Sequence, residues 1–331
     1  MPPTRRDFVQ IKQLAAGDQG AFNQGIFLVR NCCDNSECIE KRIAPGQVHS
    51  GHARREIAAM VRCKHPNIVQ WIAHDIDYRS VGYASIFMEH CELESLSIII
   101  DRFISRFAGL GHFPEKLLWK ILWDMSLALC YLQLGVDATK SAKSGKPLSR
   151  NDRKRGWDKI FHRDIKPGNI FAKGDIAWPT ITLGDFGCSI TSDHEHFDKR
   201  AEEQLMTAFT PVFGPPEQPN YTRTSDVYSL GLVVHCAARA RPYPMSNTTA
   251  RQRDPVGSSY SKELSGLVSR MLSLDPDNRP EAARLPYIVH REHSVVKDRE
   301  QAKHKDQGRK DAGRRREQRS PQWVTVRPAP L

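Results

Sequence analysis

The sequence predicts an α+β protein in which strands are concentrated in the first part of the chain and helices in the second. Residues 11–14 and 25–30 are short apolar runs around a glycine-containing turn, as in a β-hairpin. Residues 114–134 are apolar on nearly every face, begin with a proline suited to a first helical turn and precede Gly135, a residue typical of a helix C-terminus. They are expected to form a buried helix, and another helix is expected over residues 261–274.

Length and composition indicate a folded protein without a membrane anchor. The chain has 331 residues, enough for one large domain or two average ones, and 39% of them are hydrophobic. No apolar run reaches eighteen residues and none follows Arg5 and Arg6, so we expect neither a membrane-spanning helix nor a signal peptide. Eight scattered cysteines indicate reduced thiols and an intracellular location, in the cytoplasm, the nucleus or both.

The formal net charge of +11 is compatible with an acidic protein, nucleic acid or an acidic membrane as partner. No nucleic-acid recognition motif accompanies the charge, so we expect protein partners and neither nucleic acid nor membrane. Basic residues are concentrated in segments 136–158 and 290–331. The first is interpreted as a solvated loop, with a docking surface for phosphorylated or acidic partners as the alternative. The second is interpreted as disordered or as a solvated helix, with nuclear import or nucleic-acid contact as the alternative.

Residues 162–169 read His-Arg-Asp-Ile-Lys-Pro-Gly-Asn. This stretch resembles the catalytic loop H-R-D-x-K-x-x-N of the eukaryotic protein kinases, and its lysine is similar to that of the serine/threonine kinases. The resemblance implies that Asp164 accepts the proton of a substrate hydroxyl, that Lys166 neutralises charge on the transferred phosphoryl group, and that Asn169 offers an oxygen to Mg²⁺. Asp226 resembles the helix aspartate that anchors this loop.

Further stretches resemble the parts of a kinase that hold ATP and magnesium. Residues 38–41, Cys-Ile-Glu-Lys, match the V-A-I-K strand, whose lysine (Lys41) holds the α- and β-phosphates. Glu56 follows fifteen residues later and resembles the glutamate that must pair with this lysine in the active state. Residues 185–187 read Asp-Phe-Gly, sixteen residues after the catalytic-loop asparagine, which implies that Asp185 is the second magnesium ligand.

The phosphate loop and the hinge are also read by resemblance. Gly20 and Gly25 match two glycines of G-x-G-x-x-G-x-V, with Phe27 in the place of the valine; an alternative register begins three residues earlier. Glycines let the backbone approach phosphates closely and present its N–H groups. After the strand-like residues 86–88, the resemblance implies that the backbones of Glu89 and Cys91 contact adenine.

Residues 188–213 resemble an activation segment. In this family Thr210 would contact the catalytic Asp and Lys, and Glu217 would form a buried ion pair with Arg279. Thr207 is the candidate for phosphorylation by an upstream kinase, with Ser189, Thr191 and Ser192 as alternatives, and Arg163 resembles the arginine that clamps such a phosphate.

We therefore expect a two-lobed protein kinase fold with a small β-rich N-lobe and a larger, mainly helical C-lobe. The expected segments are an N-terminal extension (1–9), the kinase domain (10–289) with its N-lobe (10–88), hinge (89–95) and C-lobe (96–289), the basic insertion (136–158) and the tail (290–331). The implied function is transfer of the γ-phosphoryl group of ATP, with Mg²⁺, to serine or threonine of protein substrates. The alternative is a pseudokinase scaffold that binds nucleotide and partners without efficient catalysis. Residues 161–171 are also similar to the NIMA-related branch.

Overall fold

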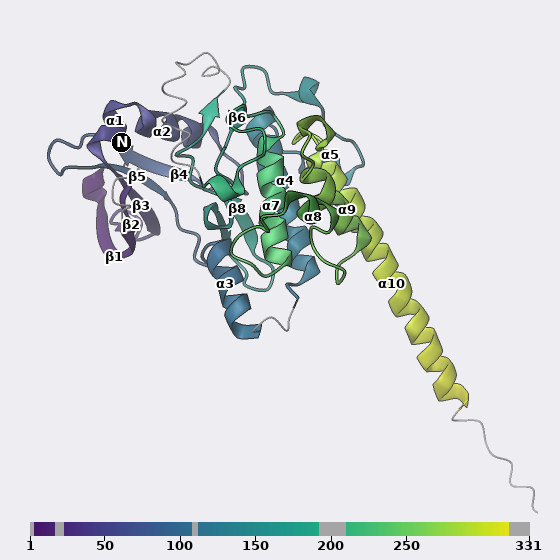
Figure 1. Cartoon of the computed structure of the whole chain (residues 1–331). Coiled ribbons are helices and arrows are strands. Elements are labelled where there is room, and N and C mark those ends of the chain that lie inside the picture. Colours follow the sequence, from purple (N-terminus) through teal and green to yellow (C-terminus); the bar gives the residue numbers. More distant parts are fainter. Residues whose placement is uncertain (1–2, 17–22, 108–111, 192–209, 318–331) are drawn as a thin grey trace, which may run out of the picture.

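The computed structural model describes residues 3–16, 23–107, 112–191 and 210–317. Gly20 of the expected phosphate loop and Thr207, the expected phosphorylation site, lie outside these residues. Within them, an N-terminal antiparallel sheet is followed by a mainly helical region, and the predicted two-lobed α+β fold is confirmed (Figure 1).

The N-lobe is built on a five-stranded antiparallel sheet with strand order β1-β2-β3-β5-β4. Helix α2 packs beside β4, and a short helix, α1, precedes α2. The elements of this lobe are a 3-10 turn (Arg5–Asp7), β1 (Phe8–Ala16), β2 (Asn23–Asn31), β3 (Glu37–Ile43), α1 (Pro45–His49), α2 (His52–Arg62), β4 (Trp71–Asp75) and β5 (Ala84–Glu89).

The two faces of this sheet bury different side chains because side chains alternate along a strand. Ile26 lies opposite Lys41 in the β2–β3 register, and Phe27 lies opposite Glu40, so these two pairs project from opposite faces. Phe27 belongs to a small apolar cluster on its face, which comprises Phe27, Val29, Cys38, Ala73 and Phe87. Ile43 shares the face of Lys41 and joins the main core of the protein.

The C-lobe is organised around two buried helices, α4 (Glu115–Leu134) and α7 (Ser225–Ala238). By length and composition α4 could cross a membrane, but 72% of its most apolar window is buried inside the fold, as in the core helix of a globular protein. Gly135 ends α4 at φ +69°. A Cβ atom there would lie 2.3 Å from the Trp157 ring, so both the backbone conformation and the space require glycine.

The other C-lobe elements surround α4 and α7. Two short antiparallel ribbons, β6–β9 and β7–β8, flank the predicted catalytic loop. These elements are α3 (Leu96–Phe107), α5 (Thr139–Lys143), β6 (Ile160–Phe161), β7 (Ile170–Lys173), β8 (Thr180–Leu183), β9 (Ile190–Thr191), α8 (Thr248–Arg253), α9 (Lys262–Met271) and α10 (Leu285–Glu317), with 3-10 turns at Arg150–Asp152, Pro167–Asn169, Pro211–Phe213 and Pro276–Asn278.

The basic insertion is more ordered than the solvated loop we expected. It forms α5 and the 3-10 turn Arg150–Asp152, and α5 packs against α10. Ala138 and Ala142 are buried, and the N–H of Lys154 donates to the carbonyl of Leu134 at 2.9 Å. Ala138 and Ala142 pack against the rest of the C-lobe, although the segment contains mostly charged and polar residues.

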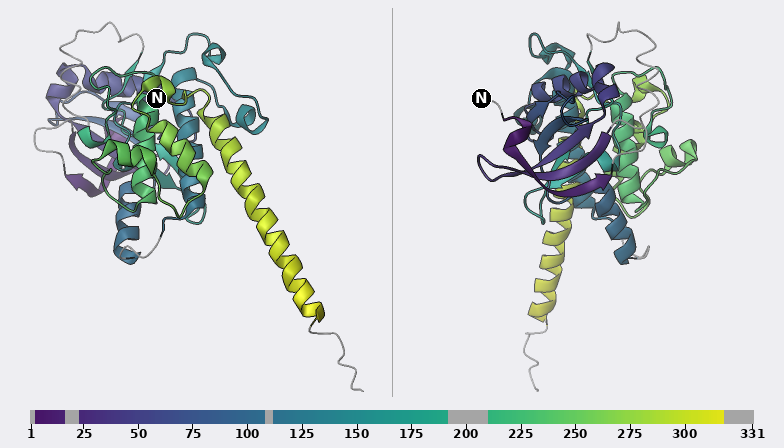
Figure 2. Two further views of the ribbon diagram at one scale, coloured as in Figure 1. Left: turned by 45° about the vertical axis from the view of Figure 1, so that its right-hand side comes forward. Right: turned by 90° about the vertical axis from the view of Figure 1, so that its left-hand side faces the viewer.

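The domain also extends beyond the expected boundary at residue 289, which lies inside α10. Val296, further along this helix, is still buried in the main core. The Trp119 ring of α4 stacks on His293 with centroids 5.1 Å apart. Past this anchor α10 projects away from the rest of the protein as a single helix (Figures 1 and 2). The tail was expected to be either disordered or a solvated helix. Its described part is helical to residue 317.

Candidate active site

The loop at residues 162–169 is held from beneath by one carboxylate of α7. Asp226 accepts hydrogen bonds from the backbone N–H groups of His162 (2.8 Å) and Arg163 (2.9 Å). Arg163 has φ +69°, a left-handed conformation that costs a non-glycine residue free energy. The buried aspartate offsets this cost by satisfying two backbone donors, and it fixes the direction of the residue that follows, Asp164.

Asp164 is buried and surrounded by donors that orient its carboxylate. Its Oδ2 accepts from the Lys166 ammonium at 2.8 Å and from the Asn169 amide at 2.9 Å. Its Oδ1 accepts from the backbone N–H of Thr210 at 3.2 Å. Lys166 also donates to the Thr210 hydroxyl at 2.8 Å. The contacts predicted for Thr210 with Asp164 and Lys166 are therefore present.

A second charged group links β3, α2 and the Asp-Phe-Gly segment. The Lys41 ammonium lies 2.6 Å from Glu56 and 2.8 Å from Asp185, and the side chains of Lys41 and Glu56 are each 6% exposed. Burial opposes ionisation of Lys41, but the two carboxylates outweigh it and hold its pKa above the usual value. Burial likewise opposes ionisation of Asp185, yet the nearby ammonium holds its pKa below the usual range. Lys41 and Asp185 are therefore charged at neutral pH, whereas burial raises the pKa of the Glu56 carboxyl above its usual value.

The Asp-Phe-Gly backbone is held on the catalytic-loop side. Asp185 adopts φ +59°, another left-handed residue at this site. Phe186 is fully buried and meets the His162 ring edge-on, with centroids 4.9 Å apart. The Nε2 atom of His162 lies 3.0 Å from the carbonyl oxygen of Gly184. These contacts connect the loop bearing Asp164 to the segment bearing Asp185.

The side chains of the hinge residues Glu89 and Cys91 contact neighbouring elements of the C-lobe. Glu89 ends β5, and its carboxylate pairs with Lys173 of β7. The Cys91 thiol is buried 3.3 Å from the Thr182 hydroxyl. Burial raises the pKa of this thiol, so it remains protonated. Only the backbone of these residues is then suited to a ligand, as the resemblance implied.

The predicted role of Phe27 in nucleotide binding is wrong on geometric grounds. Phe27 lies on the sheet face opposite to Lys41, is 6% exposed, and is covered by the Arg42 guanidinium at 3.7 Å from its ring centroid. Ile26 lies directly opposite Lys41 and is half-buried on the same face, which makes it the apolar residue of the cleft. Gly25 (φ +128°) is where glycine is needed, because a Cβ there would lie 2.8 Å from the Phe27 ring.

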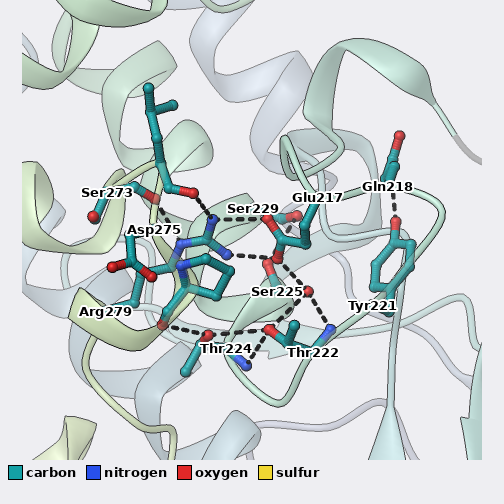
Figure 3. Close-up of polar contacts among 12 residues, drawn as sticks. Glu217, Gln218, Tyr221, Thr222, Thr224, Ser225, Ser229, Ser273, Asp275 and Arg279 are labelled. Atoms are coloured by element: carbon teal, nitrogen blue, oxygen red, sulfur yellow. Dashed lines mark hydrogen bonds and ion pairs between the residues drawn. The ribbon is translucent and has the colours of Figure 1, made fainter.

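The segment after Thr210 is anchored by the predicted ion pair. The Arg279 guanidinium donates to both oxygens of Glu217, at 2.7 and 2.8 Å, and its side chain is fully buried (Figure 3). Ser225 donates to the same carboxylate at 2.6 Å, and the Tyr228 ring lies beneath the guanidinium at 4.7 Å. Burial opposes ionisation of Glu217, but its hydrogen bonds with Arg279 and Ser225 keep the pKa of Glu217 below its usual value.

Residues 157–288 match the family model described as Protein kinase domain. The chain carries a protein kinase domain. The similar proteins include the probable serine/threonine-protein kinase nek2 of Dictyostelium discoideum, 29% identical over 77% of this chain and 53% of that protein. Nek2 of Homo sapiens is 26% identical over 85% of this chain and 58% of its own length, and the G2-specific protein kinase nimA of Emericella nidulans is 29% identical over 67% and 32%. The resemblance to the kinase family, with NIMA-related relatives, is confirmed, although the chain spans only about a third to three-fifths of these proteins.

The kinase domain places a second arginine beside Arg163 that the sequence reading missed. Arg55 of α2 directly precedes Glu56, and its Nε and Nη2 atoms are buried without a hydrogen-bond partner among the described residues. Burial lowers the pKa of Arg55, and the charge of Arg163 lowers it further. The positive charges of Arg55 and Arg163, one from each lobe, thus oppose each other. In the sequence, Arg55 could have been identified by its position directly before Glu56.

The kinase residues present also fit a magnesium ion. Asn169 uses its amide nitrogen for Asp164, at 2.8 Å to the carbonyl oxygen and 2.9 Å to Oδ2, so its amide oxygen remains available to a cation. Asp185 is ionised and its side chain is 41% exposed to the cleft. An amide oxygen and a carboxylate are the hard ligands that Mg²⁺ prefers.

Proposed function

We propose that this protein is a serine/threonine kinase that transfers the γ-phosphoryl group of ATP to protein hydroxyls. The observation that carries the proposal is the convergence of Asp164, Lys166 and the Lys41–Glu56–Asp185 group on one cleft. The family template requires the Lys–Glu pair and the Asp of Asp-Phe-Gly to be in place for activity. Both conditions are met here, which favours an enzyme over the pseudokinase alternative.

The chemical roles follow from which atoms are charged and where they are held. The Asp164 carboxylate would orient the substrate hydroxyl and accept its proton. Lys166 would stabilise charge on the transferred phosphoryl group, and Lys41 would hold the α- and β-phosphates. Asp185 and Asn169 would hold Mg²⁺, which supplies positive charge beside the phosphate oxygens. The backbones of Gly25, Glu89 and Cys91 would contact the nucleotide, and Ile26 would contact its apolar part.

The arginine pair suggests how the enzyme is regulated. Arg55 and Arg163 bring positive charge from both lobes to the side of the activation segment, and a bound anion would lower the cost of placing them there. A phosphate on the activation segment would supply about two negative charges, and we assign this role to Thr207 acted on by an upstream kinase. All eight cysteines are free thiols, which supports action inside the cell, in the cytoplasm or nucleus.

The test is transfer of a labelled γ-phosphoryl group from ATP and Mg²⁺ to a generic basic protein and to the enzyme itself. Asp164→Asn should lower turnover about a hundredfold or more, because the proton acceptor is lost, while ATP binding is retained. Asp298→Asn removes an exposed carboxylate of α10 and serves as the matched control, with unchanged turnover. Wild-type turnover in Asp164→Asn would contradict the assignment, and ATP binding without transfer by the phosphorylated wild type would favour the scaffold.

A further inference from the structure

A groove rich in arginine lies on the C-lobe, away from the catalytic cleft. It has a volume of about 760 Å³ and is lined by the 3-10 turn of the basic insertion, the end of α9, the turn before α10 and the first turns of α10. These elements lie on the side of the protein opposite to the N-terminal sheet (Figure 1). We call it the arginine groove and define it by Arg150, Arg270, Arg284, Tyr287, Ile288 and Arg291.

Cations outnumber carboxylates in the arginine groove because each glutamate is shared. Glu281 accepts from Arg150 at 3.2 Å and lies 3.3 Å from Arg223. Glu292 lies 2.7 Å from Arg291 and 3.5 Å from Arg270. One carboxylate cannot neutralise two guanidinium groups, so a positive charge remains at Arg270 and Arg291. At Glu281 the second charge is offset by Asp277, which lies 3.6 Å from Arg223.

Arg284 adds a guanidinium group with no partner at all among the described residues. It is exposed in the turn directly before α10, and it lines the groove together with Arg291 of α10. Tyr287 and Ile288 lie between them and form a partly apolar floor, with Ile288 packed against the main core. When Arg223 and Glu292, which lie beside the groove, are counted with its lining residues, charge remains in excess. The five arginines then exceed the three carboxylates by two charges; they are Arg150, Arg223, Arg270, Arg284 and Arg291 against Asp277, Glu281 and Glu292.

We propose that the arginine groove binds a phosphorylated serine or threonine side chain of a partner protein. A phosphomonoester carries about two negative charges and three acceptor oxygens, which matches the excess charge and the donors of the guanidinium groups. Its volume exceeds that of a phosphate, and the Tyr287–Ile288 floor provides contact for the neighbouring peptide side chains. The three carboxylates disfavour a long polyanion such as RNA, whose successive phosphates would approach them. This site does not depend on phosphoryl transfer, so it stands or falls apart from the proposed activity.

The first measurement is fluorescence anisotropy with the full chain and no ATP. The probes are labelled peptides of degenerate sequence around one fixed phosphoserine, and the same peptides with serine. The phosphorylated peptides should bind at least about tenfold more tightly, because hydrogen bonds to charged groups contribute that much each. Equal binding of the two sets would overturn the proposal. So would tighter binding of a labelled single-stranded RNA than of the phosphopeptides.

Variants then locate the site. Arg284→Ala and Arg291→Ala should each weaken phosphopeptide binding about tenfold, without effect on the serine peptides. Arg284→Lys should be intermediate, because an ammonium keeps the charge but not the fork of donors. Arg79→Ala removes an exposed arginine of the N-lobe and is the matched control, with unchanged binding. Full phosphopeptide affinity in Arg284→Ala would refute the site, and an unchanged melting temperature for each variant excludes misfolding.

A variant that is expected to strengthen phosphopeptide binding completes the test. Glu281→Gln removes the carboxylate shared by Arg150 and Arg223 and so raises the positive charge of the arginine groove by one. Phosphopeptide binding should become several-fold tighter at low salt. Weaker or unchanged binding in this variant would contradict the charge argument.

Discussion

Arg279 and Arg284 are five residues apart, yet they behave as opposites. The Arg279 side chain is fully buried, donates to both oxygens of Glu217 and packs on Tyr228, so its charge is consumed within the fold. The Arg284 side chain is exposed and has no partner among the described residues. Both residues line the arginine groove. A buried arginine such as Arg279 must pair with a carboxylate, and the pair stabilises the fold. An exposed arginine such as Arg284, whose positive charge is not compensated, remains available to a ligand.

The largest expected effect is the cost of breaking the buried pair. Arg279→Ala leaves the Glu217 carboxylate half-buried without its main donor and should lower the free energy of unfolding by about 3–5 kcal/mol. Arg284→Ala should change it by less than about 0.5 kcal/mol, because the side chain is exposed and unpaired. Urea unfolding of both variants measures the contrast. Similar changes in the free energy of unfolding for the two variants would contradict the different roles assigned to Arg279 and Arg284.

Histidines buried close to other cationic groups form a third class, in which the ring stays neutral. Burial, reinforced by nearby cations, lowers the pKa of His52, His235 and His293 to about 4. The unfolded chain therefore binds more protons than the folded protein between about pH 6.5 and pH 4, so stability is lost as the pH falls through this window. Each ring should cost up to roughly 2 kcal/mol at pH 5, and less where solvent screens a partly exposed ring. Urea unfolding at several pH values tests this, and His293→Gln should reduce the slope.

A smaller effect is expected in the cleft, where pairing serves orientation. Thr210→Ala removes the hydroxyl that accepts from Lys166 at 2.8 Å but keeps the backbone N–H that donates to Asp164. If the protein is a kinase, its kcat/KM should fall about tenfold, the effect of one hydrogen bond to a charged group. Thr210→Ser should retain most activity. Equal losses in the two variants would argue that the methyl group, and not the hydroxyl, is what matters.

The mildest test is the response to salt. Exposed charges are screened over about 8 Å at physiological ionic strength, whereas buried pairs are screened much less. Phosphopeptide binding to the arginine groove should therefore weaken several-fold between low and high salt. The stability difference between wild type and Arg279→Ala should stay nearly constant over the same range. Equal sensitivity of the two quantities would place both arginines in the same environment.

Much of the active site followed from short motifs in the sequence. Asp164 contacts Lys166 and Asn169, and Lys41 contacts Asp185, because each motif lies in or next to a strand or turn that the fold brings to the neighbouring motif. Their roles in phosphoryl transfer stay a prediction. The prediction for Phe27 is wrong because a glycine motif does not fix which of two neighbouring residues faces Lys41, whereas strand register does. A shift of one residue reverses the face of a strand, and only pairing with β3 shows which residue accompanies the lysine.

The sequence by itself determined the fold class and the residues whose chemistry lies in consecutive positions, because spacing within a motif is a property of the chain. Tertiary structure alone decided the faces of the N-lobe sheet, the order of the basic insertion and the arginine groove. The arginine groove combines residues from about 150 to 291 on separate elements, and its excess charge depends on which carboxylates are shared. The net charge can be summed from the sequence. Whether a given arginine is neutralised depends on its distance from a carboxylate, and only the folded chain sets that distance.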